Sequence, residues 1–153
     1  MATVQMLRPY VEKTVAEFLG LENVEIVDDG DILIRAGSAI SFAQLLDGPT
    51  GPMFRVFSPL LTEVKKSPQL FERLNDLNSA SAYIRFFWAD DVIYCATEFL
   101  AETLQPDDIV NGVGVVSWHA DQLDDFLQSE FGGQRMREEE EATKLQAWNP
   151  SYL

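Results

Sequence analysis

The connections between the first four apolar runs of this sequence are short, and this feature constrains the fold most strongly. The runs are rich in β-branched and aromatic side chains and comprise residues 24–27, 32–36, 39–46 and 53–60. No more than six residues separate one run from the next. A parallel pair of strands needs a crossover connection of about a dozen residues or more. The four runs are therefore predicted to form an antiparallel meander, which disfavours a doubly wound parallel sheet.

Three other segments carry apolar side chains at steps of three and four residues, which is the period of an amphipathic helix. The first is predicted to have Pro9 near its start and to end at Gly20. The second begins after Ser67, which can cap it. The longest runs from about Asp107 to the pair Gly132-Gly133.

Residues 82–89 and 92–99 form a second pair of apolar and aromatic runs, joined by Asp90-Asp91. If the two aspartates make a two-residue turn, alternate residues of this hairpin face opposite sides of the sheet. The side suited to pack beneath the helices carries the pairs Ile84–Thr97, Phe86–Cys95 and Trp88–Ile93. The other side carries the pairs Tyr83–Glu98, Arg85–Ala96 and Phe87–Tyr94.

Together these patterns predict an α+β fold in which an antiparallel β-sheet of five to six strands carries its helices on one face. The expected order of elements is α-β-β-β-β-α-β-β-α. The folded domain is expected to span residues 1–133, followed by an acidic tail at residues 134–153. A chain of this length can bury about 70% of its unfolded surface, so its core needs no metal or disulfide.

The charge and the cysteine content exclude several kinds of partner. Eleven Lys and Arg residues stand against 25 Asp and Glu residues, which gives a formal net charge of −14. Such a surface repels phosphate groups, so we expect no nucleic acid and no membrane as a partner. The single cysteine, Cys95, excludes an intramolecular disulfide and suits a reducing compartment. The sequence shows neither a signal-peptide pattern nor an apolar run of membrane-spanning length, and we expect a cytoplasmic protein.

No arrangement of residues predicts catalysis. The segment Gly112-Val113-Gly114 resembles a dinucleotide-binding loop, but it lacks the third glycine and lies inside a helix, where small residues allow close packing. Ser117, His119 and Asp121 provide the residue types of a hydrolase triad, but residues two apart on one helix point in different directions. Because His119 is the only histidine, histidine-paired catalysis and metal sites with several histidines have no other histidine to use. We therefore expect no enzymatic activity.

The acidic clusters do not predict a metal site. They lie at residues 28–31, 90–91, 107–108 and 124–125, and none has the ligand spacing of a calcium loop. Roles in turns, in helix capping and on solvated helix faces explain them. We therefore expect no metal and no cofactor.

One side of the second hairpin has the composition of a protein-binding surface. It combines aromatic side chains with polar groups, and its candidate residues are Tyr83, Arg85, Phe87, Tyr94 and Glu98. Arg35 and Arg55 also lie in the middle of predicted strands, and we include them among the candidate partner-binding residues. The simpler alternative is that the three arginines pair with neighbouring carboxylates on an exposed sheet.

The tail combines an acidic stretch, Glu138 to Glu141, with three apolar side chains near its end, Trp148, Tyr152 and Leu153. The glutamates are expected to form a short solvated helix, whereas Pro150 favours an extended end. Disordered segments are poor in such side chains, so we expect this end to dock on a protein groove, in cis or on a neighbouring copy. A flexible terminus with incidental aromatic residues is the alternative.

The order of elements and four local motifs resemble the type III secretion chaperone and YbjN-like group, in particular the peptide-binding chaperone-like proteins of actinobacteria. The motifs are Gly37-Ser38-Ala39, Leu74-Asn75-Asp76-Leu77-Asn78, Arg85-Phe86 with Glu98 facing it, and Ala120-Asp121-Gln122-Leu123-Asp124-Asp125 through to Phe131-Gly132-Gly133. The resemblance covers roughly residues 5–133. It implies a small α+β homodimer that holds a segment of another protein and has no enzymatic activity. Asn75 and Asn78 are expected to cap or bridge backbone groups at the entry to the following strand.

Two functional hypotheses follow. The first is a non-enzymatic, peptide-binding chaperone-like or adaptor protein that holds a segment of a partner protein and forms a homodimer. The alternative is a regulatory domain that senses a small ligand between the long C-terminal helix and the sheet. Aromatic patches on the surface would favour the first hypothesis, and an enclosed, polar-lined cavity would favour the second.

Overall fold

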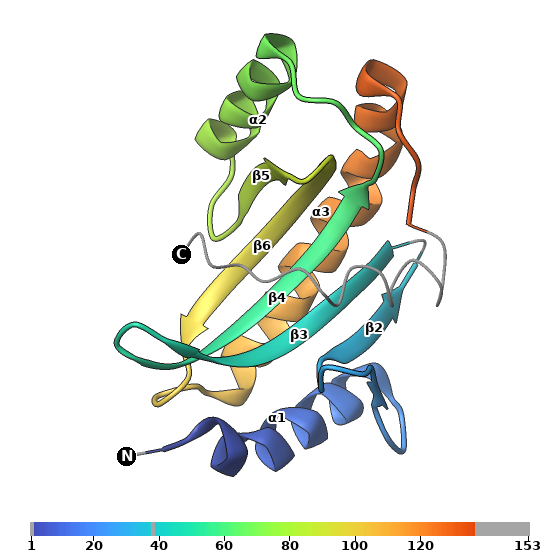
Figure 1. Ribbon diagram of the computed structural model, residues 1–153. Helices are drawn as coiled ribbons and strands as arrows, with labels where there is room; N and C mark the ends of the chain where they lie inside the picture. Colours follow the sequence, from blue (N-terminus) through green and yellow to red (C-terminus); the bar gives the residue numbers. More distant parts are fainter. Residues whose placement is uncertain (1, 38, 137–153) are drawn as a thin grey trace.

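The computed structural model describes residues 2–37 and 39–136, which form three helices and six strands (Figure 1). In chain order these are α1 (Val4–Leu19), β1 (Glu25–Ile26), β2 (Ile32–Ala36), β3 (Ala39–Gly48), β4 (Gly51–Leu61), α2 (Pro68–Ala80), β5 (Arg85–Ala89), β6 (Val92–Leu100) and α3 (Pro106–Phe131). This order confirms the one expected from the sequence. The predicted acidic helix and the aromatic end of the tail lie outside the described residues.

The six strands form one antiparallel sheet in the order β1-β2-β3-β4-β6-β5. In the view of Figure 1, α3 crosses behind the sheet, with α1 near its lower end and α2 near its upper end. All three helices contribute side chains to one core, so the expected packing of helices on one face is confirmed. None of the described helices is long and apolar enough to cross a lipid bilayer.

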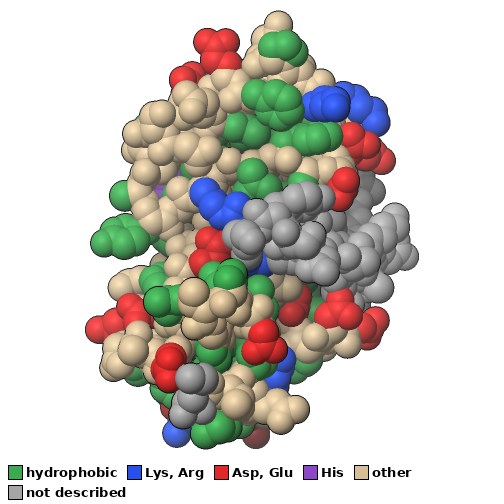
Figure 2. Space-filling view, turned by 60° about the vertical axis from the view of Figure 1, so that its left-hand side comes forward, with side chains coloured by type: hydrophobic (Ala, Val, Ile, Leu, Met, Phe, Trp, Pro, Cys, Tyr) green, Lys and Arg blue, Asp and Glu red, His purple; other side chains and the backbone are tan. Residues whose placement is uncertain are grey.

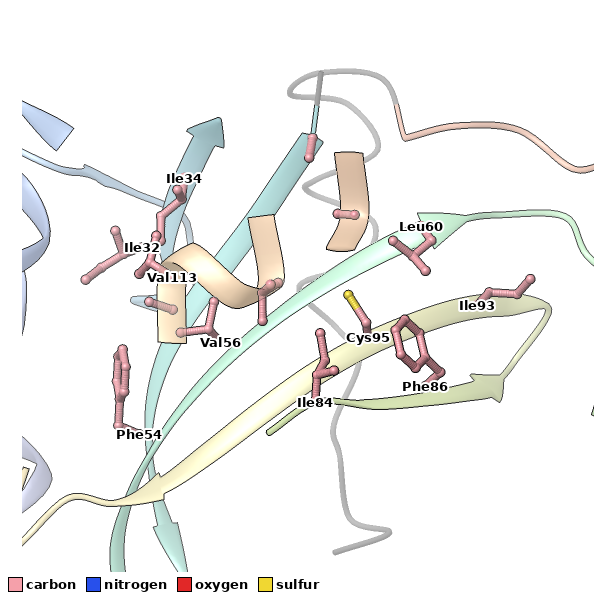
Figure 3. Packing of buried hydrophobic residues seen from close by; sticks show 14 of the residues in the cluster. Ile32, Ile34, Phe54, Val56, Leu60, Ile84, Phe86, Ile93, Cys95 and Val113 are labelled. Carbon is pink, nitrogen blue, oxygen red and sulfur yellow. The ribbon is translucent and has the colours of Figure 1, made fainter. Parts of the chain in front are cut away.

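The main hydrophobic core lies between the sheet and the helices (Figure 3). There, strand side chains such as Val56 and Cys95 pack in the same cluster as Val113 of α3. Because side chains alternate along a strand, the intervening residues point to the opposite face. They form a second cluster of buried residues, which contains Leu33, Ile40, Phe42, Phe57, Ala89, Val92, Tyr94 and Ala96. The sheet therefore carries an apolar cluster on each face.

The first helix begins earlier than the sequence predicted. Thr3 caps it, because its Oγ1 accepts a hydrogen bond from the N–H of Met6 at 3.2 Å, and the helix starts at Val4. Pro9 consequently lies inside the helix and not near its start. At the other end, Gly20 adopts the expected left-handed conformation with a φ of 70°.

The connection between β3 and β4 is shorter than expected. Asp47 pairs with Pro52 and Gly48 with Gly51, so a turn of two residues replaces the predicted loop of six. Gly51 has a φ of 134°, a backbone conformation that residues with a Cβ atom rarely adopt. As a result, β3 and β4 are ten and eleven residues long and form the centre of the sheet.

The sequence predicted close packing at the small residues near the start of α3, and the structure shows it at Gly112. A Cβ atom on Gly112 would lie 3.0 Å from Cε2 of Phe99 and 3.4 Å from Cγ2 of Val56. The lack of a side chain therefore lets α3 lie close to β4 and β6. Gly114 differs, because a Cβ atom there would have no atom within 4 Å.

Gly112→Val should lower the free energy of unfolding by about 1–3 kcal/mol, because the added methyl groups would force α3 or Phe99 to move. Gly114→Val is the matched control, and it should leave stability unchanged or raise it slightly, since glycine is a poor helix former. Urea denaturation measures both effects. Equal stability of the two variants would contradict the close packing of α3 at Gly112.

Candidate functional site

Four aromatic rings form a row across the face of the sheet that is opposite the helices. They are Phe42 on β3, Phe57 on β4, Tyr94 on β6 and Phe87 on β5. The ring centroids of Phe42 and Phe57 are 5.2 Å apart, and those of Tyr94 and Phe87 are also 5.2 Å apart. The centroids of Phe57 and Tyr94 are separated by 6.3 Å and complete the series. We call these four residues the aromatic row, and such neighbouring rings attract each other beyond their burial.

A second row of side chains, the polar row, lies beside the first and consists of Asp31, Gln44, Arg55, Glu98 and Arg85. Glu98 Oε1 accepts hydrogen bonds from Nε of Arg55 at 3.1 Å and from Nη2 of Arg85 at 2.6 Å. Arg55 Nη1 donates to Oε1 of Gln44 at 3.5 Å. Gln44 Nε2 donates in turn to Oδ2 of Asp31 at 2.9 Å. The polar row therefore links residues of β3, β4, β6 and β5.

Two guanidinium groups share the carboxylate of Glu98. Burial by itself would raise the pKa of Glu98, but the hydrogen bond from Arg85 and the charges of Arg85 and Arg55 outweigh burial and hold the pKa below its ordinary value. Burial lowers the pKa of Arg55, and the charge of Glu98 opposes this effect. Burial raises the pKa of Asp31, which the hydrogen bond from Gln44 counteracts. Glu98 is thus shared by two guanidinium groups, and Asp31 adds a weaker favourable charge beside Arg55.

Arg55 retains one hydrogen-bond donor without an acceptor. It is the largest of the fully buried side chains and has 0% of its surface exposed. Within the described part of the chain, its Nη2 has no hydrogen-bond partner. An unpaired buried polar group costs roughly 1–3 kcal/mol, and more when it is charged. An oxygen atom brought to this face by another segment would relieve that cost.

Five of the seven partner-binding residues predicted from the sequence lie in these two rows, namely Arg55, Arg85, Phe87, Tyr94 and Glu98. Arg35 lies on the same face near the β1 edge, where its Nε donates to Oε2 of Glu25 at 3.3 Å. All three arginines therefore pair with carboxylates, as the simpler alternative required. Arg55, however, is fully buried, whereas that alternative placed it on an exposed sheet.

Tyr83 does not join this face, and its predicted pairing with Glu98 is wrong. Its φ of 62° lies in the left-handed region, which an extended strand cannot contain, so β5 begins only at Arg85. The pairing of β5 with β6 starts at Arg85 and Ala96, so Glu98 lies beyond it and has its strand partner, Arg55, on β4. Tyr83 is 82% exposed and lines a groove together with Phe18 and Val115, on the helical side of the molecule.

Asn78 of α2 closes part of the outer edge of β5. Its Nδ2 donates to the carbonyl oxygen of Phe86 at 2.9 Å, and its Oδ1 accepts from the N–H of Phe86 at 2.8 Å. This confirms the predicted bridging role of Asn78. Because a side chain already occupies these backbone groups, a further strand cannot pair with β5 at Phe86. The structure thus favours the face of the sheet over this edge as a binding surface.

Four residues of the two rows were not predicted from the sequence, namely Phe42, Phe57, Gln44 and Asp31. A signal for two of them was present, because Phe57 lies two residues after Arg55 and Gln44 lies two residues after Phe42, so each pair shares one face of a strand. Joining the two strands required their register, which places Gln44 opposite Arg55 and Phe42 opposite Phe57. That register depends on the tight turn that the sequence analysis read as a longer loop.

The single histidine, which was considered for catalysis, and the single cysteine both lie against other parts of the fold. His119 Nδ1 lies 2.8 Å from the carbonyl oxygen of Val115 on the same helix. Cys95 is fully buried beneath the helices, and burial raises the pKa of its thiol to about 12. Among residues 2–37 and 39–136, no group of three or more His, Cys, Asp and Glu side chains is arranged to hold a metal ion.

The space between α3 and the sheet is filled by side chains of the main core, including Val113, Val116 and Phe54. A hollow of about 620 Å³ does lie beside α3, but its walls include Phe18 and the exposed Tyr83, so it is an open surface groove. The side of the molecule in Figure 2 shows Lys and Arg as separate blue spots among acidic and hydrophobic side chains. The described residues visible on that side form no continuous basic surface.

Comparison with solved structures identifies the fold. The chain is similar to the ExsC–ExsE complex, with a TM-score of 0.63, 13% sequence identity, and coverage of 83% of this chain and 97% of the other. It is also similar to the Yersinia pestis type III secretion chaperone SycH in complex with a stable fragment of YscM2, with a TM-score of 0.55, 15% identity, and coverage of 76% and 98%. The HopA1–SchA chaperone–effector complex gives a TM-score of 0.55, 12% identity, and coverage of 82% and 99%.

Sequence comparison identifies the family. No curated protein sequence matches the chain. A family model described as "T3SS (YopN, CesT) and YbjN peptide-binding chaperone 1", or TY-Chap1, matches residues 5–139. None of these comparisons supports the alternative hypothesis of a ligand-sensing domain. Because the model covers nearly the whole sequence, this chain belongs to the TY-Chap1 family of peptide-binding chaperones, as the resemblance of its motifs indicated.

Proposed function

We propose that this chain holds a segment of another protein on the face formed by the aromatic row and the polar row, and that it catalyses no reaction. The observation that carries this proposal is a row of four neighbouring rings beside a fully buried arginine with an unused donor. Membership in a family of peptide-binding chaperones supports a peptide segment as the ligand. Each of the three similar solved structures is a complex of two proteins, which also favours a protein client.

The two rows offer complementary interactions to a peptide. Aromatic side chains supply a large apolar area, and anchors of this kind are worth about 1–3 kcal/mol each on truncation. The Arg85 guanidinium lies 4.5 Å above the ring of Phe87, so charged and apolar contacts are available side by side. Arg55 Nη2 can donate to a backbone carbonyl or a carboxylate of the client. The chemistry therefore suits a segment that contains both apolar and acidic or polar residues.

The proposal includes a homodimer and a cytoplasmic location. Burial of an aromatic face between two copies would use the same apolar surface that a client uses. Cys95 is a buried free thiol, which suits a reducing compartment. Client binding and self-association are therefore expected to respond to the same substitutions.

Phe87→Glu should weaken client binding by roughly 5- to 150-fold, which corresponds to the loss of an anchor worth about 1–3 kcal/mol. The client is first identified by affinity purification of the tagged full chain from its native cell. Binding of that client to the variants is then measured by titration. Sedimentation velocity of the same variant should show a monomer.

Trp118→Glu provides the matched control, since it makes the same chemical change at a side chain that is 61% exposed on α3. It should leave client affinity and oligomeric state unchanged. Circular dichroism checks that both variants are folded. Loss of binding in Trp118→Glu and retention in Phe87→Glu would place the binding surface on the helical layer and overturn the proposal.

Glu98→Gln should lower the free energy of unfolding by about 3 kcal/mol, because it removes the carboxylate that pairs with the buried guanidinium of Arg55 and leaves only the weaker influence of Asp31. Glu130→Gln is the control, since Glu130 pairs with Arg73 at 2.8 Å on the exposed surface, and its loss should cost much less. Chemical denaturation at neutral pH compares the two variants with the original chain. Equal effects would contradict the central role of the polar row.

The effect of Glu98→Gln should also depend on pH. Because the pKa of Glu98 in the folded state lies below the ordinary value of 4.5, its contribution to stability is present above that pH and is lost as the pH falls through the folded-state pKa. The stability difference between the original chain and the variant should therefore shrink below about pH 4.5. Asp31, whose pKa is raised, titrates in both proteins. A difference that stays constant down to pH 3 would show that Glu98 is not held ionised by the arginines.

Magnesium or calcium at millimolar concentration, and nucleotides at micromolar concentration, should leave the melting temperature unchanged. A ligand that binds only the folded state raises the melting temperature by mass action. Differential scanning fluorimetry with each ligand measures this directly. A saturable rise of several degrees with any of them would contradict the non-enzymatic assignment.

A further inference from the structure

Two glycines and a short β-bridge fix the direction in which the chain leaves α3. Gly132 and Gly133 have φ values of 72° and 80°, and Gln134 then forms an antiparallel bridge with Thr62 through backbone hydrogen bonds of 2.8 and 2.9 Å. A Cβ atom on Gly133 would lie 2.6 Å from the carbonyl oxygen of Thr62, so this approach requires glycine. The two glycines therefore direct the chain to the end of β4 rather than simply freeing it from the helix.

Beyond this bridge the chain reaches the face that carries the aromatic row. Arg135 forms ion pairs with Asp124 and Asp125 of α3. Met136, the last described residue, packs against the cluster that contains Phe42 and Phe57. The segment 132–136 thus passes from the helical layer to the opposite face of the sheet.

The cluster on that face is apolar and its members are buried. Phe42, Phe57 and Tyr94 are only 1–2% exposed, although the three helices lie on the other side of the sheet. Among the described residues, the partly buried hydrophobic side chains that pack against this cluster are Val27, Phe87 and Met136. Three such side chains, two of which come from the sheet and its edge loop, do not make a layer. Within the described part of the chain, the helices contribute their side chains to the other cluster and not to this one.

The sequence that follows Met136 has the length and chemistry to cover this face. Residues 137–153 can extend over about 55 Å at ~3.3 Å per residue, whereas six strands at ~4.8 Å spacing span only about 25 Å. Trp148, Tyr152 and Leu153 supply apolar side chains that match the aromatic row. Three of the 11 basic residues of this acidic protein, Arg35, Arg55 and Arg85, lie on this face. Glu138 to Glu141 supply carboxylates that can pair with them. The unused Nη2 donor of Arg55 is a specific site for one such oxygen.

We propose that residues 137–153 cover the aromatic row and the polar row of their own chain when no client is bound, and that a client displaces them. The segment then acts as an internal competitor, which sets the affinity for clients and shields the apolar face from solvent. This inference rests on the proposed function, because the segment and the client are assigned to the same face.

Thiol protection in the full chain tests the cover directly. Ala96→Cys places a thiol in the cluster on this face, and the neighbouring native Cys95 points into the core beneath the helices and serves as an internal control. The tail variant adds Trp148→Ser, Tyr152→Ser and Leu153→Ser. The rate at which a thiol reagent labels each position is followed by peptide mass spectrometry.

The thiol introduced by Ala96→Cys should react at least about tenfold faster in the tail variant than with the original tail, while Cys95 stays protected in both. Ala89→Cys, which lies in the same cluster, provides a second reporter in case Ala96→Cys does not fold. Equal labelling rates with the original and the altered tail would overturn the inference. Faster labelling of Cys95 as well would indicate general unfolding and would also overturn it.

A synthetic peptide with the sequence of residues 137–153 serves as the probe for competition. It should bind the tail variant and restore protection of the Ala96→Cys thiol, and it should bind the original full chain at least about tenfold more weakly. Equal binding to both proteins would contradict internal competition. The labelling experiment needs no client, so it tests the tail independently of the proposed function. If labelling shows that the tail covers the face but Phe87→Glu leaves client binding intact, only the proposed function is overturned. Unchanged labelling would overturn only the covering role of the tail.

Discussion

The fully buried guanidinium of Arg55 is the constraint on which the sheet face opposite the helices depends. Removing such a charge from water costs several kcal/mol unless a partner compensates it. Glu98 provides the compensation, and it is shared with Arg85, so β4, β6 and β5 must keep one register for both contacts to form. The same register brings Tyr94 beside Phe87. The aromatic row is therefore positioned by the polar row next to it.

The described helices cover one face of the sheet and not the other. On one face, α1, α2 and α3 close a core that holds Cys95, and Gly112 allows the closest approach of α3. The other face carries an apolar cluster and a charged side chain with one unused donor. Asn78 meanwhile occupies backbone groups on the outer edge of β5. A peptide-binding chaperone needs a face of this kind, because a segment that arrives from elsewhere can complete it.

The sequence predicted the order of elements and the two faces of the second hairpin, because alternation and short turns are local properties. The pairs Arg85–Ala96, Phe86–Cys95, Phe87–Tyr94 and Trp88–Ile93 all occur as expected. Tyr83 was misplaced, since a positive φ at a non-glycine residue leaves no mark in a hydrophobic pattern. Phe42 and Phe57 were missed because the register of β3 and β4 depends on a two-residue turn. The covering role of residues 137–153 remains a prediction, since they lie outside the described part of the chain.

The central claim is that the face bearing the aromatic and polar rows is where the client binds. Site-specific photo-crosslinking in the native cell tests it most directly, with a photoreactive amino acid placed at position 87 on that face or at position 118 on the exposed side of α3. The account predicts a crosslink to the client from position 87 and none from position 118. A crosslink from position 118 alone would contradict it and would assign client binding to the helical layer.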